Sequence, residues 1–408
     1  MPDRGRGRGP PVTALSVVRT AGSPERPTFL ELLVDLVYVF ALTRVSQRLI
    51  DDVAAPTRLP FAAIGETLLL LLALWLTWLI TVWSTSWLDP EVPVIRVVLL
   101  ITMVGSMVMA VAVPRGFTDH ALVFAVAYVG VQLTRVVYYG LATRRSGGAP
   151  SALRSLFWSG LAAPLWIVGA LIPQEPARAA LWAAGLLVQY TAWALGYPVP
   201  WYGRDRIADQ PVAAGHLAER YQQFLLIALG EVIFTIGVAF SGGPFLLPET
   251  VGFALGIGAT VLFWQIYFQR AGRVLTEAIG AARRPSIIGF SAAYAHLPMI
   301  VGIVLSGVGY ELVISEPLAA PEPMWLLAIL GGPGLFLAGR AGLEFQMYSR
   351  VSRSRTAGFV LLGALVPVLW RVPPLAAGAV ATAVLLGVAL ADLRRARGRE
   401  PELPVPRP

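Results

Sequence analysis

Apolar stretches of about 20 residues recur along the whole chain, and this is the length that an α-helix needs to cross a lipid bilayer. Twelve such segments can be marked, at residues 28–50, 61–87, 93–114, 118–141, 151–173, 177–198, 214–241, 248–270, 286–310, 322–340, 355–371 and 374–393. Hydrophobic residues make up 56% of the chain and charged residues only 14%. Because a backbone inside a bilayer must satisfy its own hydrogen bonds, the sequence predicts an all-α, polytopic transmembrane bundle of about twelve spans.

Arginine distribution predicts the orientation in the membrane. All 32 basic residues are arginine; if the N-terminus is cytoplasmic, 24 of them flank the cytoplasmic side, five the opposite side, and Arg44, Arg135 and Arg220 fall within spans. Basic residues favour the cytoplasmic side, so we expect a cell-membrane protein with both termini in the cytoplasm. The net charge of +8 then indicates contact with anionic lipid headgroups and not with nucleic acid, since no aromatic residues are interleaved with the basic ones.

Missing residue types exclude several chemistries. The chain has no cysteine, which rules out disulfides, thiolate nucleophiles and cysteine-ligated metals. It also has no lysine, which rules out a Schiff base to retinal or pyridoxal phosphate. No tight ligand motif such as HExxH is present, so we expect neither a metal nor an organic cofactor.

The chain divides into two similar halves of six segments each. GLAAPLWIVGALIP (160–173) resembles GALVPVLWRVPP (363–374), and LTWLITVW (76–83) resembles LFWQIYF (262–268), in the same order. Two parallel six-helix repeats would be related by an axis along the membrane normal, with a site expected between them. The predicted divisions are a disordered Arg/Gly/Pro-rich tail (1–27), a first half (28–198), a cytoplasmic linker (199–213), a second half (214–393) and a cytoplasmic tail (394–408).

Equivalent segments of the two halves carry acidic residues. In ELLVDLVYVFALTR (31–44), Glu31 and Asp35 share one helix face, whereas Arg44 lies on the opposite face and about 13 Å away. The partner of Asp35 must therefore come from another helix. In GHLAERYQQFLLIALGEVIFTIG (215–237), the helical spacing aligns a polar stripe: His216, Arg220, Gln223, Ile227 and Glu231.

Five sequence segments carry a family resemblance. ELLVDLVYVFALT, SWLDPEVPVIRVVLL, GHLAERYQQFLLIALGE, AYAHLPMIVGIVLSGVGYELV and LGGPGLFLAGRA are similar to the ordered signature segments of the bacterial low-temperature-requirement A (LtrA) family. The resemblance implies a multi-helix inner-membrane protein linked to growth in the cold, and it implies no established biochemical activity. The motif positions of the family match Glu31, Asp35, His216, Glu219, Arg220, Gly230, Glu231, His296, Leu297 and Pro298.

The chain departs from the family pattern at two places. It has Leu33 and Val34 where a Phe pair is common, and Val232 where a small hydroxyl residue often follows the deep glutamate. The second departure removes an expected hydrogen-bond partner of Glu231.

The polar residues admit two interpretations. A charge in mid-membrane costs at least ~2.5 to 3.5 kcal/mol, so such residues face the bundle interior and find partners. Asp35, Glu231 and His296 then line a proton or ion path with Arg220 as counter-charge, or they form a static network that orients helices. For His296 a neutral structural role is the common outcome. Glu31, His216 and Glu219 lie near the cytoplasmic interface, where solvated or capping roles are expected.

Three functions remain open. The first is a proton-linked secondary transporter or ion pathway for an unknown small substrate or ion, using Glu31, Asp35, His216, Glu219, Arg220, Gln223, Glu231 and His296. The second is an intramembrane enzyme for a lipid or other hydrophobic substrate, with Asp35 or Glu231 as general base. The third is a non-catalytic role in membrane adaptation. Polar groups spread through the membrane depth favour the transporter over the enzyme.

Overall fold

The chain is a bundle of long helices in a computed structural model that describes residues 17–19, 26–54, 60–144, 149–205, 212–269, 271–320 and 322–397. These residues contain thirteen α-helices and no strand, with two isolated β-bridges in the connections. The helices are α1 (Phe29–Ala54), α2 (Pro60–Trp87), α3 (Pro93–Ala112), α4 (Ala121–Thr143), α5 (Ala149–Leu171), α6 (Glu175–Leu195), α7 (Ala214–Ser241), α8 (Leu247–Phe268), α9 (Ala271–Ala281), α10 (Pro285–Ser315), α11 (Pro323–Tyr348), α12 (Arg353–Leu369) and α13 (Pro374–Ala396).

Each of the twelve predicted segments coincides with one long helix. Local sequence explains the boundaries: α3, α6, α8, α10, α11 and α13 carry proline in their first turn, where its missing N–H is not needed. Helix α6 ends at Gly196, whose left-handed φ of 74° lets its N–H bond to the carbonyls of Ala192 and Trp193.

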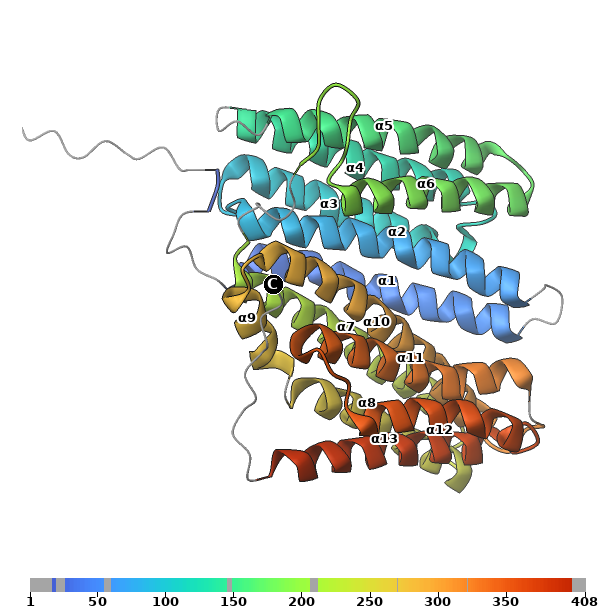
Figure 1. Cartoon of the computed structure of the whole chain (residues 1–408). Coiled ribbons are helices and arrows are strands. Elements are labelled where there is room, and N and C mark those ends of the chain that lie inside the picture. Colours follow the sequence, from blue (N-terminus) through green and yellow to red (C-terminus); the bar gives the residue numbers. More distant parts are fainter. Residues whose placement is uncertain are drawn as a thin grey trace, which may run out of the picture.

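Nine of the described helices are long and apolar enough to cross a membrane: α2, α3, α4, α5, α7, α8, α10, α11 and α13. Helix α1 is too rich in charged residues to meet the same criterion, and α12 has only 17 residues. The multi-pass membrane character is therefore established, while crossing by α1, α6 and α12 stays a prediction. All twelve long helices nevertheless lie side by side in one bundle (Figure 1).

Helix α9 is an element that the sequence analysis did not predict. Its 11 residues span roughly 16 Å, about half the hydrocarbon thickness of a bilayer. Val274, Leu275, Ala278 and Ile279 form a buried face against α7 and α10. It lies at the end of the bundle where α1 begins, which we call the Glu31 end (Figure 1).

The two predicted halves meet mainly along α1 and α2 of the first half and α7 and α10 of the second. Contacts between α1 and α7, α2 and α7, and α1 and α10 join them. In the first half α1 packs on α2 and α3, and α3, α4, α5 and α6 follow in sequence. In the second half α7 packs on α8 and α10, and α10, α11, α12 and α13 follow in the same manner.

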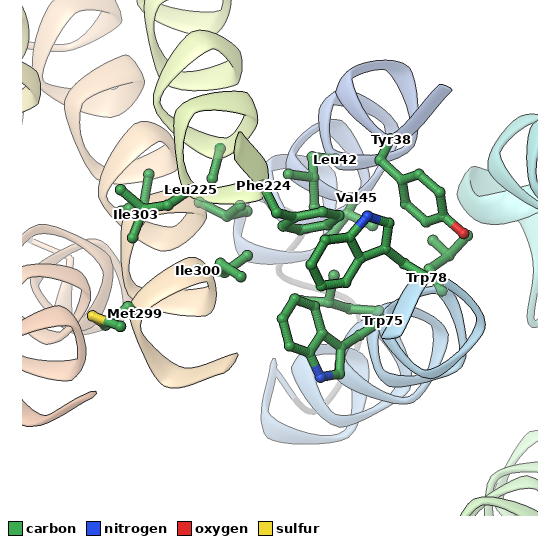
Figure 2. Packing of buried hydrophobic residues seen from close by; sticks show 14 of the residues in the cluster. Tyr38, Leu42, Val45, Trp75, Trp78, Phe224, Leu225, Met299, Ile300 and Ile303 are labelled. Atoms are coloured by element: carbon green, nitrogen blue, oxygen red, sulfur yellow. The ribbon is translucent and has the colours of Figure 1, made fainter. Parts of the chain in front are cut away.

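The core between the halves is aromatic. Phe224 of α7 inserts among Tyr38 of α1 and Trp75 and Trp78 of α2, with ring centroids 5.7, 5.2 and 4.2 Å away (Figure 2). Leu225 of the same helix faces Ile300 and Ile303 of α10 (Figure 2). Helix α7 is thus packed on both sides. This packing fixes the position along the bundle axis at which its polar residues meet α1.

Helices α10 and α11 approach each other at backbone contact. A Cβ added at Gly302 would lie 2.4 Å from the backbone nitrogen of Phe336, and one added at Gly332 would lie 2.6 Å from that of Ser306. Only glycine fits at such a crossing. The GGPG sequence of 331–334 is therefore a close-packing site inside an unbroken helix α11.

The predicted tails and linker fall partly outside the described residues. In the N-terminal tail, residues 17–19 pair with the turn after α2 through Val18 and Leu88, and Arg19 donates from Nε to the Thr85 carbonyl at 2.8 Å. Residues 1–16, 20–25, 206–211 and 398–408 lie outside the described residues.

Candidate functional site

The carboxylate of Asp35 meets two donors from other helices. Its Oδ1 accepts a hydrogen bond from Nη2 of Arg220 on α7 at 2.8 Å and another from Nε1 of Trp78 on α2 at 2.9 Å. Asp35 is 3% exposed and Arg220 is 1% exposed. The partner that the helical geometry required from elsewhere in the chain is thus an arginine of the other half.

Glu31 has two roles one turn earlier on α1. Its Oε2 accepts the backbone N–H of Thr28 at 2.8 Å, which caps the start of the helix. Its Oε1 lies 2.8 Å from Nε2 of His216 and 3.9 Å from Nη1 of Arg220. Both Glu31 and His216 are fully buried; of the solvated or capping roles that the sequence analysis expected, Glu31 has the capping one.

A serine on α2 completes the surroundings of His216. Oγ of Ser86 lies 3.2 Å from Nδ1 of His216 and 2.9 Å from the carbonyl oxygen of Val82. If the ring is neutral with its proton on Nε2, Ser86 can donate to Nδ1; if the ring is doubly protonated, Nδ1 donates to Ser86, whose proton turns to Val82. The site therefore accommodates both protonation states of His216 without a change of partner.

We call Glu31, Asp35, His216 and Arg220 the α1–α7 network. It holds two acids, one arginine and one histidine in a region closed to solvent. Several of its atoms lack a hydrogen-bond partner among the described residues, namely Oδ2 of Asp35 and Nε and Nη1 of Arg220. Because buried charges are stable only when paired, the addition or removal of one proton changes how strongly α1 holds α7.

Gln223 of the predicted stripe and the nearby candidate Glu219 lie apart from this network. Nε2 of Gln223 donates to Oε1 of Glu219 at 3.3 Å, one turn away on the same helix, and both side chains are partly exposed. The structure thus divides the stripe: His216 and Arg220 turn toward α1, while Glu219 and Gln223 bond to each other.

Glu231 occupies a separate, fully buried position farther along α7. Its Oε1 accepts a hydrogen bond from the hydroxyl of Thr235 at 2.7 Å, so a residue one turn later supplies the hydroxyl that Val232 lacks. Its Oε2 has no hydrogen-bond partner among the described residues. Ser46 of α1 lies next to this carboxylate, and Gly307 of α10 faces Oε2.

Two further acids lie between Glu231 and the bundle end opposite to the Glu31 end. Glu311 of α10 lies close enough to Glu231, and to Asp51 of α1, to interact electrostatically with both acids. Glu231 is fully buried, Glu311 is partly exposed and Asp51 is exposed. The sequence analysis did not select Glu311 or Asp51, because each stands near the end of an apolar segment, where acids are common.

His296 is held by other aromatic residues. Its Nδ1 lies 2.7 Å from the carbonyl oxygen of Ala292, to which it must donate, so in the neutral ring Nε2 accepts from the hydroxyl of Tyr267 at 2.7 Å. Its ring stacks on Tyr221 with centroids 4.9 Å apart. Both ring nitrogens are occupied by partners outside the α1–α7 network, an arrangement typical of a neutral structural histidine.

Two other buried ion-pair clusters were not selected from the sequence. Near the end of α1, Arg48 pairs with Glu66 of α2 at 2.8 Å and with Asp52 at 3.5 Å. In the second half, Arg355 of α12 pairs with Glu344 of α11 and Asp392 of α13. Each residue lies at the edge of an apolar segment, where the sequence pattern does not separate a buried charge from a solvated one.

Within the part of the chain that the structure describes, no group of three or more His, Asp or Glu side chains is placed to hold a metal ion.

Comparisons with known proteins agree with the signature segments. The family model described as bacterial low temperature requirement A protein (LtrA) matches residues 26–390. The chain is also 35% identical over 378 residues to an uncharacterized protein of Rhizobium meliloti (strain 1021), covering 90% of this chain and 88% of that protein. No solved structure matches the chain. With a match over nearly its whole length, the chain belongs to the bacterial LtrA family.

Proposed function

We propose that this protein is a proton-linked secondary transporter or ion pathway of the cell membrane. The observation that carries the proposal is the α1–α7 network, in which a buried arginine and a buried histidine of one half hold two buried acids of the other. A transporter needs a contact between its halves that forms and breaks with proton binding. The paired charges of the α1–α7 network, which are closed off from solvent, provide such a contact.

The arrangement of the helices supports two parallel six-helix repeats. The helix pairs in contact in the first half recur in the second, with α1 corresponding to α7, α2 to α8, α3 to α10, α4 to α11, α5 to α12 and α6 to α13. Under this correspondence the acidic helices α1 and α7 are equivalent and adjacent. Parallel repeats are known in transporters that rock one half against the other around a site between them.

Proton binding at Asp35 or Glu31 would unlock the Glu31 end. With both acids ionised, Arg220 is attracted to each, and separating α1 from α7 would leave buried charges unpaired at a cost of about 3–5 kcal/mol. A proton on His216 would strengthen its contact with Glu31, whereas a proton on Asp35 removes the charge that Arg220 bonds. Opening then follows protonation.

Glu231 provides a second position for the proton. It is fully buried, and Glu311 and Asp51 lead from it toward the opposite end of the bundle. A carboxylate in this place can receive a proton from that end while the Glu31 end is closed. The two acidic positions on α7 and α1 thus serve opposite sides of the membrane.

The orientation follows from the arginine bias of the sequence. With both termini in the cytoplasm, all twelve long helices cross the bilayer and the Glu31 end faces the cytoplasm. The excess of arginine on that side then lies against anionic lipid headgroups.

The test is proton flux in proteoliposomes under an imposed pH gradient. A dye inside the vesicles reports flux for the natural protein, for Glu231→Gln and for the control Glu249→Gln, whose side chain caps α8 by accepting the N–H of Leu246. We expect Glu231→Gln to fold and to lose flux, and the control to retain it. Full flux in Glu231→Gln between pH 5 and 8 would make the deep acid structural and would favour the static network.

A further inference from the structure

A cavity in the first half lies outside the α1–α7 network. It has a volume of about 130 Å³ and is lined by residues of α2, α4, α5 and α6 and of the connection after α6. Aromatic side chains form much of its wall: Trp83, Trp87, Tyr139, Trp158 and Trp193. Since one water needs roughly 10–15 Å³ of such space, the cavity has room for roughly ten atoms.

Arg135 of α4 lines this cavity as a buried cation. It is 3% exposed, Nη2 donates to Oε1 of Gln132, and Nη1 has no hydrogen-bond partner among the described residues. No described carboxylate forms an ion pair with it. Asp205, the acid in the cavity wall, is bonded to Arg154 and to Ser151 instead.

A buried guanidinium without a counter-charge is costly, and a cavity beside it gives room for an anion that would remove the cost. We propose that this cavity binds an organic anion and that Arg135 is its anchor. The anion would carry one carboxylate or phosphate group on a flat apolar body, with about ten heavy atoms in all. The planar guanidinium can donate two parallel hydrogen bonds to such a group. The indole and phenol rings provide flat surfaces for the body.

Polar groups around the cavity fit the same ligand. The amide Nε2 of Gln132 and the hydroxyl of Tyr139 are also buried without partners among the described residues. Both can donate to an anionic oxygen. Ser155 and Ser159 of α5 also line the cavity and supply two more hydroxyls.

One helix connects this cavity to the α1–α7 network. Trp83 of α2 lines the cavity, and its Nε1 donates to the hydroxyl of Tyr221 on α7 at 3.0 Å. Ser86, three residues later, lies against His216. An anion in the cavity and a proton in the network therefore act on the same helix. The inference that the anion is a transported substrate rests on the proposed function, whereas the inference that the cavity binds the anion does not.

The binding test uses the full chain in phosphatidylcholine nanodiscs, with benzoate and benzamide as probes in calorimetry. The two probes have the same size and differ in charge. We expect the natural protein to bind benzoate roughly tenfold or more tightly than benzamide, as one charge-assisted hydrogen bond implies. Arg135→Gln should lose this preference.

Two further variants keep the result interpretable. Arg340→Gln removes an arginine of α11 that is similarly buried but bonds the Ile266 carbonyl of α8, so the benzoate affinity of this variant should be unchanged. Ser159→Leu fills the cavity and leaves Arg135 in place, so it should bind neither probe, and it serves if Arg135→Gln does not fold.

A lipid headgroup is the other source of such an anion. In nanodiscs that also contain phosphatidylglycerol, competition with benzoate that disappears in Arg135→Gln would identify a lipid as the occupant. If neither benzoate nor phosphatidylglycerol binds in an Arg135-dependent way, the inference is wrong, even with proton flux intact. If binding holds while the flux assay fails, the cavity remains an anion site and the transporter proposal is wrong.

Discussion

Nη2 of Arg220 lies 2.8 Å from Oδ1 of Asp35, although 185 positions separate the two residues in the chain. The pair joins the helices α1 and α7 from opposite halves of the bundle, and both side chains are excluded from solvent. Trp78 donates to the same carboxylate oxygen, so a third helix fixes its orientation. This contact makes the polar residues of α1 and α7 mutually dependent.

Replacing Arg220 should therefore destabilise the protein strongly. Arg220→Gln leaves Asp35 buried without its counter-charge, and we expect a loss of about 3–5 kcal/mol in the free energy of unfolding. Denaturant unfolding in mixed micelles measures it. The matched control is Arg44→Gln, since Arg44 is partly exposed and, among the described residues, bonds Gln47 and lies over the Phe40 ring; the loss for this variant should stay below about 1 kcal/mol.

Removing both partners should cost less than the two single losses together. Asp35→Asn and Arg220→Gln each leave one buried charge unpaired, whereas the double variant leaves none. We expect a coupling free energy of about 1–3 kcal/mol from the double-mutant cycle, measured by the same unfolding assay. Additive losses would mean that the two side chains do not interact in the membrane.

The aromatic contact between the halves gives a third expectation. Phe224→Ala removes a ring that packs on Tyr38, Trp75 and Trp78, and we expect a loss of about 3–5 kcal/mol. Leu226→Ala on the same helix is the control because Leu226 is 46% exposed at the bundle surface. An equal loss for both variants would contradict the proposed interface.

Glycine at the crossing of α10 and α11 gives a fourth expectation. Gly332→Ala places a Cβ 2.5 Å from Oγ and 2.6 Å from N of Ser306, so the helices must separate at a cost of about 1–3 kcal/mol. Gly342→Ala on the same helix meets nothing within 4 Å and should stabilise the helix by about 0.5–1 kcal/mol. Thermal unfolding of the two variants should shift in opposite directions.

Topology can be read with single cysteines because the chain has none of its own. Trp201→Cys tests the connection before α7 and Ser241→Cys the end of α7; both positions are exposed. With both termini in the cytoplasm, a membrane-impermeant maleimide added outside intact cells should label Cys at 241 and not at 201. The reverse labelling pattern would overturn the proposed orientation and, with it, the placement of the Glu31 end on the cytoplasmic side.

The local sequence determined the helices themselves. Apolar length predicted twelve segments, and each coincides with a helix, because a chain in lipid must satisfy its own backbone hydrogen bonds. The same reasoning missed α9, whose 11 residues are too short for the transmembrane pattern. Helical spacing also established that Arg44 could not be the ion-pair partner of Asp35 within the same helix.

Only the tertiary structure decided which side chains meet. Arg220 and His216 both turn toward α1, while Gln223 bonds Glu219 and His296 bonds Tyr267, although all six stand in segments with similar apolar patterns. Periodicity assigns a residue to a face of its own helix. It does not say which helix covers that face, since this depends on packing between residues as distant as Phe224 and Trp78. For the same reason the cavity beside Arg135 could not be foreseen from a single segment.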